Sequence, residues 1–577
     1  MRLLTLLVTL AALGQAASGP PPERLRPANY VYGLPADLPP PNGTLEPWIQ
    51  RFTADLEDLD RFYSTPWSKA RRDVLRGMYR TWRDALAKAD FNALSQDGKV
   101  DYLVFRNRLA ERLRELDLEE NRAREIAPLL PFLDEITGLA EARQRIDPVK
   151  PEEAAALLGK VAQQVKQLTA KPPAAGIKRT AANRAARVAG QLREILRGWN
   201  GFYTGYDPLF TWWIAEPYKA LDAALREYAE ALREKVAGVA KEDKETILGD
   251  PVGREALLSD LAGEFIPYTP EELIAIADRE FAWCEAEMKK ASRELGYGDD
   301  WRRALEYVKT LHVPPGRQPG LVRDLALEAI DFVEKNNLIT VPPLAKATWT
   351  MEMMTPERQK LNPFFLGGDR IIVAYPANTM SEDEKRMALR GNNIYFARAT
   401  VFHELIPGHN LDGFMRARYR QYRQEFYTPF CIEGWALYWE MLLWDRGFAR
   451  GPEDRIGMLF WRMHRCARII FSLNFHLEKM TAQECVRFLI ERGGQEPENA
   501  AAEVRRSFEG DYGPLYQIAY MVGALQFLAL SREVTTPLRD FHDSVLRLGP
   551  MPVEMIRATL LRKPLTRDYA ASWRFYK

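Results

Sequence analysis

The chain has 577 residues, long enough for more than one domain, and 46% of them are hydrophobic, which is ample for a buried core. Charged residues make up 28% of the chain and nearly cancel, leaving a net charge of +1. This balance argues against a nucleic-acid-binding protein or a protein held on a membrane by a basic surface. No internal repeat or low-complexity tract is visible, which argues against a solenoid or a disordered tail.

The N-terminal segment, residues 1–17, is typical of a secretory signal peptide. A single arginine precedes an apolar run over residues 3–13, and small residues follow it. The run is too short for a membrane-spanning helix, and no cysteine lies near the cleavage region to carry a lipid anchor. We therefore expect an exported, soluble protein, periplasmic or extracellular, with no transmembrane segment.

Residues 18–315 are predicted to form a helical N-terminal half. Apolar residues recur there every three or four positions, with charged residues between them. The segments with this pattern are 55–89, 101–126, 152–171, 184–199, 216–237 and 271–295. Capping boxes, which mark helix starts, are expected at Thr269 with Glu272, Ser381 with Glu384, and Thr481 with Glu484.

Residues 316–577 are predicted to form a second, mainly helical half that carries the chemistry. Only residues 347–354 and 369–376 are rich in strand-forming side chains, and both precede a histidine-containing motif. The expected fold class is therefore mainly α, with a small β-sheet next to the helix of that motif. Proline-rich joints separate parts of the chain, but a single core shared by both halves is the alternative. The four cysteines are expected to be free thiols or to form one bridge.

The motif VFHELIPGHN, residues 401–410, nearly matches the zinc-binding helix pattern H-E-x-x-H. His403 and His409 are six residues apart, so a regular helix would turn them about 240° away from each other. Pro407 interrupts a helix, and Gly408 allows unusual backbone geometry, so a break there would let His409 return toward His403. The alternative is that the Pro-Gly pair simply ends the helix and His409 is an ordinary loop residue.

The residues around this motif favour a metal site. The chain has only six histidines, and two of them share the motif with Glu404. Glu433 follows His409 by 24 residues, within the apolar segment CIEGWALYWEMLLW (residues 431–444), where a carboxylate needs a partner. A glutamate from a second helix is the third zinc ligand of thermolysin-like sites. Glu440, two turns further on, is expected either to orient a ligand or to be a surface residue.

The motifs H-E-x-x-P-G-H and E-G-W-A-L-Y resemble the bacterial domain-of-unknown-function family 885, many of whose members are exported. The resemblance spans most of the mature chain in layout and is most specific over residues 401–525. That family is similar, distantly, to the gluzincin peptidases, which include angiotensin-converting enzyme and the helical carboxypeptidases. Dipeptidyl peptidase III also has extra spacing between its motif histidines. The resemblance implies a multi-helix, zincin-like cleft fold with one Zn²⁺ per chain.

The resemblance also assigns roles to individual residues. The residues that match zinc ligands are His403, His409 and Glu433. Glu404 matches the general base that takes a proton from water. Tyr520 resembles the tyrosine that donates a hydrogen bond to the oxyanion, and Tyr516, one turn earlier, is the substitute. For either tyrosine alone, a core aromatic residue is the competing interpretation.

The chain departs from the family pattern at several positions. Asn410 stands where many members have a second histidine, and Asp412 stands where they have glutamine. Ser472 and Asn474 replace an acidic and glycine pattern before His476. The metal-binding residues are intact, so these departures bear on substrate binding. His476 is expected to be a substrate or oxyanion contact, or a packing histidine.

Together these features predict an exported zinc-dependent metallohydrolase, specifically a peptidase acting on short peptides or other small amides. The strand DRIIVAYPAN, residues 369–378, is expected either to bind extended peptide at its edge or to be buried without contacting substrate. His464 and Arg468, one turn apart, are candidates to face the cleft. The alternatives are a non-catalytic exported protein that binds a metal or ligand, and a zinc amidase or esterase acting on a non-peptide substrate.

Overall fold

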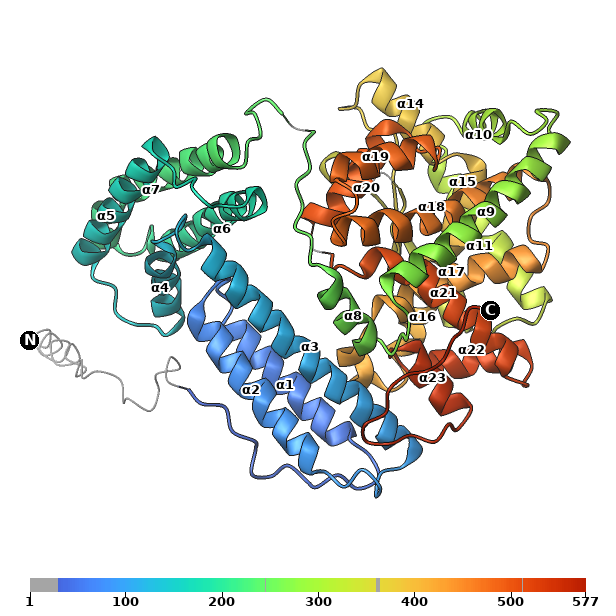
Figure 1. The fold of residues 1–577 in the computed structure, drawn as a ribbon, viewed down its shortest axis with the longest axis horizontal. Helices are drawn as coiled ribbons and strands as arrows, with labels where there is room; N and C mark the ends of the chain where they lie inside the picture. The colour runs from blue at the N-terminus through green and yellow to red at the C-terminus, as the bar shows by residue number, and fades with distance from the viewer. Residues whose placement is uncertain (1–29, 244, 360–363, 511) are drawn as a thin grey trace, which may run out of the picture.

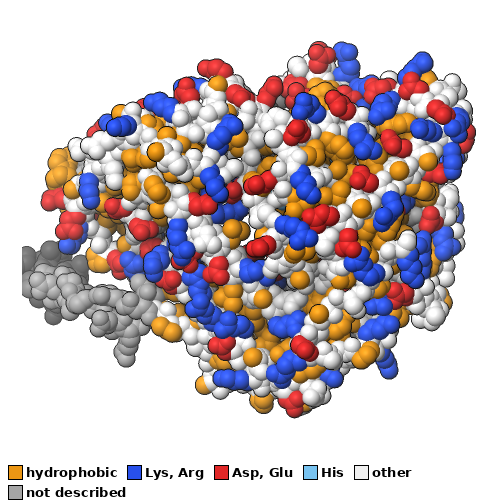
Figure 2. Space-filling view, in the orientation of Figure 1, with side chains coloured by type: hydrophobic (Ala, Val, Ile, Leu, Met, Phe, Trp, Pro, Cys, Tyr) orange, Lys and Arg blue, Asp and Glu red, His pale blue; other side chains and the backbone are white. Residues whose placement is uncertain are grey.

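The computed structural model describes residues 30–243, 245–359, 364–510 and 512–577, and the predicted signal peptide lies outside these ranges. The described chain is mainly helical, as expected, with a sheet of only two strands (Figure 1). Within these ranges, no helix combines the length and the apolar character needed to cross a membrane. Figure 2 shows acidic and basic side chains interspersed over one face of the molecule.

Three long helices begin the described chain and lie side by side (Figure 1). They are α1 (Glu46–Phe62), α2 (Lys69–Lys88) and α3 (Gln96–Ile126). The stretch 55–89, predicted as helical, is interrupted between α1 and α2 around Pro66, which cannot donate a backbone hydrogen bond. Ser68 then starts α2 by accepting a hydrogen bond from the backbone N–H of Arg71.

The next group of helices has a hydrophobic core of its own. Its members are α4 (Leu133–Gln144), α5 (Pro151–Ala170), α6 (Arg179–Tyr203) and α7 (Pro208–Ala231), followed by a π-helical turn, η3 (Leu232–Val236). Buried side chains between Ile126 and Ala237 form this core. These helices therefore pack mainly against one another and do not share the core around the motif of residues 401–410.

The remaining chain forms the larger body on the right of Figure 1. Its helices before the motif are α8 (Arg254–Gly263), α9 (Pro270–Glu294), α10 (Trp301–Lys309), α11 (Gln318–Lys335), α12 (Pro343–Thr348), α13 (Pro356–Gln359) and α14 (Glu382–Gly391). The later ones are α15 (Ile394–Glu404), α16 (His409–Arg416), the 3-10 turn η4 (Gln421–Phe426), α17 (Pro429–Asp445), α18 (Pro452–His476), α19 (Ala482–Glu491), α20 (Pro497–Glu509), α21 (Tyr516–Glu533), α22 (Leu538–Arg547) and α23 (Val553–Leu560). All three predicted capping boxes are confirmed, at the starts of α9, α14 and α19.

Both predicted strands form, and they pair with each other. They are β1 (Thr350–Met353) and β2 (Arg370–Val373), parallel, with Thr350 opposite Arg370. On the other side of β2, Leu366 forms an antiparallel bridge with Ile372. Buried side chains of β2 pack with Ala397, Val401 and Leu405, at and just beyond α15. The sheet therefore lies next to the motif helix, as expected.

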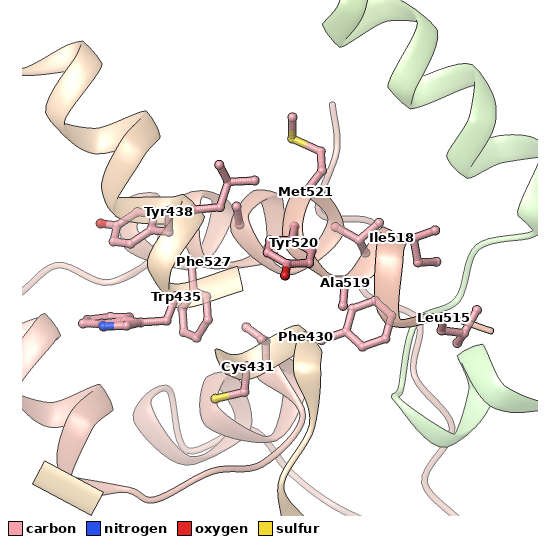
Figure 3. Close-up of a cluster of buried hydrophobic side chains, with 14 of the residues drawn as sticks. Phe430, Cys431, Trp435, Tyr438, Leu515, Ile518, Ala519, Tyr520, Met521 and Phe527 are labelled. Carbon is pink, nitrogen blue, oxygen red and sulfur yellow. The ribbon is translucent and has the colours of Figure 1, made fainter. Parts of the chain in front are cut away.

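The largest hydrophobic cluster takes side chains from Tyr32 to Phe575, on both sides of residue 315. Within it, α17 and α21 pack side by side, and Figure 3 shows their aromatic residues facing one another. Their backbones approach closely: a Cβ added to Gly523 would lie 2.1 Å from the carbonyl oxygen of Phe430. Glycine is needed here because any side chain would push the helices apart. All four cysteines are buried and free.

A buried ion pair joins the N-terminal helices to the motif-bearing region. Arg423, in η4, is 0% exposed and donates from Nε to Oδ1 of Asp101, in α3, at 2.8 Å. Tyr422 donates to the other carboxylate oxygen at 3.0 Å, and Arg423 also donates from Nη1 to the carbonyl oxygen of Leu548. These hydrogen bonds thus join three segments that are far apart in sequence: α3, η4 and the residue after α22, Leu548.

We predict that Asp101→Asn lowers the free energy of unfolding by about 3–5 kcal/mol, because the buried Arg423 guanidinium loses its closest counter-charge and keeps Asp97 at 4.0 Å. Asp117, also in α3, pairs with Arg76 at 3.1 Å with 68% of its side chain exposed, and provides a matched control. Asp117→Asn is expected to cost under about 1 kcal/mol. Urea-induced unfolding of the two variants measures both values, and equal midpoints would contradict the prediction.

Candidate metal centre

The two motif histidines lie together because the helix breaks between them. Helix α15 ends at Glu404, and α16 begins at His409. Between the two helices, the Ile406–Pro407 peptide bond is cis. The imidazole centroids of His403 and His409 are 4.9 Å apart, with their planes at 87°. A continuous helix would have pointed these rings in different directions.

Glycine is required at position 408 because the backbone of His403 leaves no room for a side chain. A Cβ on Gly408 would lie 1.9 Å from the carbonyl oxygen of His403, an impossible contact. Its φ is −80°, so a left-handed conformation is not the reason for glycine. Trp435, from α17, donates from Nε1 to the carbonyl oxygen of Pro407 at 3.2 Å. The turn is therefore held tightly against the helix that carries Glu433.

Glu433 extends from α17 toward both imidazoles. Its Oε2 atom lies 3.1 Å from Nε2 of His409 and 3.6 Å from Nε2 of His403. Although burial opposes ionisation, the two imidazoles hold the pKa of Glu433 well below its ordinary value. The carboxylate is therefore charged and directed at the point between the two rings.

These three side chains fit a tetrahedral zinc ion. Zinc–nitrogen and zinc–oxygen bonds of about 2.0–2.1 Å place neighbouring ligand atoms roughly 3.3 Å apart, and the measured 3.1 and 3.6 Å bracket that distance. Two imidazoles and one carboxylate leave a fourth position open, as catalytic zinc sites require. The ligand atoms of His403, His409 and Glu404 also lie within 4.8 Å of one another. A divalent cation would balance the carboxylates that are buried around the two imidazoles.

Glu404 is the second carboxylate beside the histidines. Its Oε2 atom is 4.0 Å from Nε2 of His409, farther than the oxygen of Glu433, so Glu433 is the better third ligand. Burial raises the pKa of Glu404 above its ordinary value. Glu404 directly follows His403 at the end of α15, so it lies beside the two histidines. It is not needed as a ligand, because Glu433 is closer to His409.

Glu440 supports His403 from behind. Its Oε1 atom is 2.7 Å from Nδ1 of His403, and both side chains are buried. This contact fixes the ring and leaves Nε2 directed toward Glu433. Burial alone would lower the pKa of His403, but hydrogen bonds to Glu433 and Glu440 outweigh it and raise the pKa to about 9. Since metal binding needs the neutral ring, a proton would leave as the metal enters.

The two candidate tyrosines of α21 occupy different positions. Tyr516 donates its hydroxyl to Oε1 of Glu433 at 2.6 Å, so it orients that carboxylate. The ring of Tyr520 lies nearly parallel to the imidazole of His403, with centroids 6.2 Å apart. Both tyrosines line the cleft, and burial raises the pKa of each, so both phenols are neutral donors. Of the two, Tyr516 is the one hydrogen-bonded to Glu433, within the residues that the structure describes.

A cavity of about 960 Å³ opens onto these residues. Its walls come from α15, α16, α17, α18, α20 and α21, and from the segment 364–368. The residues of this cavity that belong to the predicted site are His403, Glu404, His409, Glu433, Tyr516 and Tyr520. The volume is that of a small-molecule or short-peptide site.

Some predicted residues are not brought to this cavity. His476 lies at the end of α18, about 16 Å along the helix axis from Arg465, and its ring packs against Phe508. Strand β2 pairs with β1 along one edge and, at Ile372, with Leu366 on the other, and the segment 364–368, not β2, lines the cavity. Of the two expectations for residues 369–378, the structure therefore favours a strand that does not contact substrate.

Two of the positions expected to depart from the family pattern, Asn410 and Asp412, have structural partners. Asn410 donates from Nδ2 to the carbonyl oxygens of Gly368 and Asp369, at 3.2 and 3.1 Å. Asp412 is buried and accepts from Nε of Arg416 at 2.8 Å. Asn410 thus ties the cavity-lining segment to the start of α16.

Sequence reasoning missed four arginines of the cavity wall, Arg358, Arg416, Arg465 and Arg506; Arg468 was a weaker candidate. Arg465 and Arg468 belong to α18, and Arg506 belongs to α20. His464 is buried and does not line the cavity; Gln495 donates to it. The available signal was the run RMHRCAR (residues 462–468), which places four polar side chains between two apolar stretches of α18, residues 456–461 and 469–471.

Comparisons with known proteins place this site in a family. The family described as "Bacterial protein of unknown function (DUF885)" matches residues 57–560. No curated protein matches the chain significantly. A candidate lipoprotein of unknown function from Shewanella oneidensis is 17% identical, with 90% of this chain and 100% of that chain covered and a TM-score of 0.68. A candidate lipoprotein from Colwellia psychrerythraea is 14% identical, with 90% and 98% covered and a TM-score of 0.58. The likeness to both structures shows a shared fold, and the match over residues 57–560 shows that the chain belongs to the DUF885 family of bacterial proteins.

Proposed function

We propose that this protein is a zinc-dependent hydrolase that cleaves peptide bonds in short peptides. The observation that carries the proposal is the position of Glu404, a buried carboxylate 4.0 Å from His409 in the same cavity as the histidine–glutamate group. A protein that only stores a metal needs no carboxylate beside its ligands, whereas hydrolysis needs a base there.

His403, His409 and Glu433 would hold the zinc ion, with Glu440 and Tyr516 fixing the orientation of two of these ligands. When bound, zinc polarises a carbonyl group and lowers the pKa of water to near neutrality. The rest of the chemistry falls to side chains of this chain. The fold that we propose around them is a zincin-like cleft, similar to that of the gluzincin peptidases.

Glu404 accepts a proton from the attacking water and passes it to the leaving nitrogen as the peptide bond breaks. Tyr520 donates its phenolic hydrogen to the carbonyl oxygen as that oxygen gains negative charge. Its neutral hydroxyl serves this role better than a charged group, since it does not compete for the metal.

The cavity volume indicates the size of the substrate, and the predicted signal peptide indicates where in the cell the protein acts. A cavity of about 960 Å³ suits short peptides better than folded proteins. The apolar N-terminal segment of the sequence directs the chain out of the cytoplasm, to the periplasm or the outside. The proposed role is therefore cleavage of small peptides in the cell envelope or beyond it.

We predict that Glu404→Gln lowers the rate of peptide cleavage by about 10²–10⁴-fold while zinc stays bound, because the amide cannot accept the proton. A library of short peptides, analysed by mass spectrometry for new termini, gives the rate, and elemental analysis gives the zinc content. Glu382→Gln, at the exposed start of α14, is the control and should retain full activity. Full activity in Glu404→Gln would rule out this role, and loss of zinc would make Glu404 a ligand.

We also predict that Tyr516→Phe weakens zinc affinity by about 10–100-fold, because Glu433 loses the hydrogen bond that orients it. Tyr438→Phe is a matched control, since Tyr438 lies buried in α17 and pairs with His542 instead. Competition with a chromogenic chelator measures both affinities. Equal affinities in the two variants would show that Tyr516 does not act on a zinc ligand.

A further inference from the structure

Helix α18 directs two buried arginines into the cavity beside the candidate metal centre. Arg465 is 4% exposed and Arg468 is 2% exposed, and both line the cavity. They are three residues apart, so they lie on the same face of the helix. Arg506, from α20, lines the same wall. Guanidinium groups are seldom this deeply buried without matching carboxylates.

The carboxylates nearby do not match the three positive charges. Glu503 accepts from Nε of Arg468 at 2.6 Å and lies 3.2 Å from Nε of Arg506, so one carboxylate serves two guanidinium groups. Among the described residues, the carboxylate nearest to Arg465 is Glu440, at 3.9 Å, and it already contacts His403. Burial, and the repulsion from Arg468, lower the pKa of Arg465. This wall of the cavity therefore carries an excess of positive charge.

Hydrogen bonding leads to the same conclusion. Within the part of the chain that the structure describes, Arg465 has no hydrogen-bond partner, and Arg468 has one, Glu503, which accepts from Nε. Nε of Arg465 and Nη1 of Arg468 are fully buried, so only the other nitrogens of the two guanidinium groups can face the cavity. Leaving charged donors unsatisfied costs free energy. An anionic group in the cavity would give these other nitrogens acceptors and would supply the missing charge.

The arginines lie close to the reacting centre. Their guanidinium carbons are 4.7 Å (Arg465) and 4.5 Å (Arg468) from the ring centroid of Tyr520. Two further rings lie near that of Tyr520: Tyr516, at 5.9 Å, and the imidazole of His403, at 6.2 Å between centroids. Tyr520 is thus a neighbour both of a candidate zinc ligand and of the two arginines. One residue of extended peptide spans roughly 3.5 Å, so a group one or two residues from the cleaved bond would reach the arginines.

We propose that Arg465 and Arg468 bind a carboxylate of the substrate, so that the preferred substrates are peptides with a free carboxylate one or two residues from the cleaved bond. This inference rests on the proposed function, since it places that carboxylate relative to the cleaved bond. The planar fork of arginine matches a carboxylate with two parallel hydrogen bonds. The carboxylate is either the C-terminal one, which would make the enzyme a carboxypeptidase, or the side chain of an acidic residue.

Binding measurements test the proposal without relying on turnover. The probes are N-acetyl-trialanine, its C-terminal amide, and the same amide with aspartate as the last residue. Calorimetry with the zinc-loaded Glu404→Gln protein should show the free acid binding about 10–100-fold more tightly than the trialanine amide, the gain from a hydrogen bond between charged groups. If the aspartyl amide binds as tightly as the free acid, a side-chain carboxylate is sufficient for binding. If it binds as weakly as the trialanine amide, the site requires the C-terminal carboxylate.

Substitutions then assign the preference to these arginines. Adding Arg465→Gln should bring the ratio of acid to amide affinity close to one, whereas Arg465→Lys should keep part of it. Arg462→Gln is the matched control, because Arg462 is half-buried in the same helix but pairs with Glu280, away from the cavity. Circular dichroism confirms that each variant is folded.

Different results would overturn the carboxylate-binding site and the proposed hydrolase activity. Equal binding of acid and amide, no binding of any probe, or a preference that survives Arg465→Gln would overturn the carboxylate site, even if wild-type protein cleaves peptides. Conversely, a clear preference for the acid in a protein that cleaves no peptide would overturn the proposed hydrolase and leave the carboxylate site in place.

Discussion

The arrangement of the candidate site depends on one close backbone contact. Gly408 lies against the carbonyl oxygen of His403 so tightly that a Cβ would approach it to 1.9 Å. That contact lets the chain reverse between α15 and α16 and return His409 to within 4.9 Å of His403, ring to ring. Trp435 holds the turn from α17, the helix that also supplies Glu433. The ligands are thus positioned by backbone packing before any metal is considered.

Around this turn the charges are divided into two groups. Carboxylates from α15 and α17 surround the imidazoles, where a divalent cation would balance them. Guanidinium groups from α18 and α20 line the neighbouring wall, where an anion would balance them. The two groups meet where Arg465 lies 3.9 Å from Glu440, and the ring of Tyr520 is a neighbour of both. A peptide that carries a carboxylate near its cleaved carbonyl has the complementary order of polar groups.

Local sequence signals predicted the parts of this structure that depend on local interactions. Capping boxes, helical periodicity and the spacing from His409 to Glu433 all act within one or two helices, and the structure places these residues as expected. The hydrogen bond from Tyr516 to Glu433 depends on how closely α17 and α21 cross, which a single sequence does not encode in any short motif. The same holds for the bridge of Leu366 to Ile372, on the second edge of β2, and for the direction of Arg465.

The most direct test of the account is anomalous X-ray diffraction at the zinc absorption edge, from crystals of the mature protein grown with zinc. The account predicts one strong peak per chain, bonded to Nε2 of His403, Nε2 of His409 and a carboxylate oxygen of Glu433, with a fourth position open toward Glu404. A peak elsewhere, or none between the two imidazoles, would contradict the central claim that the break at Pro407 and Gly408 builds a metal centre.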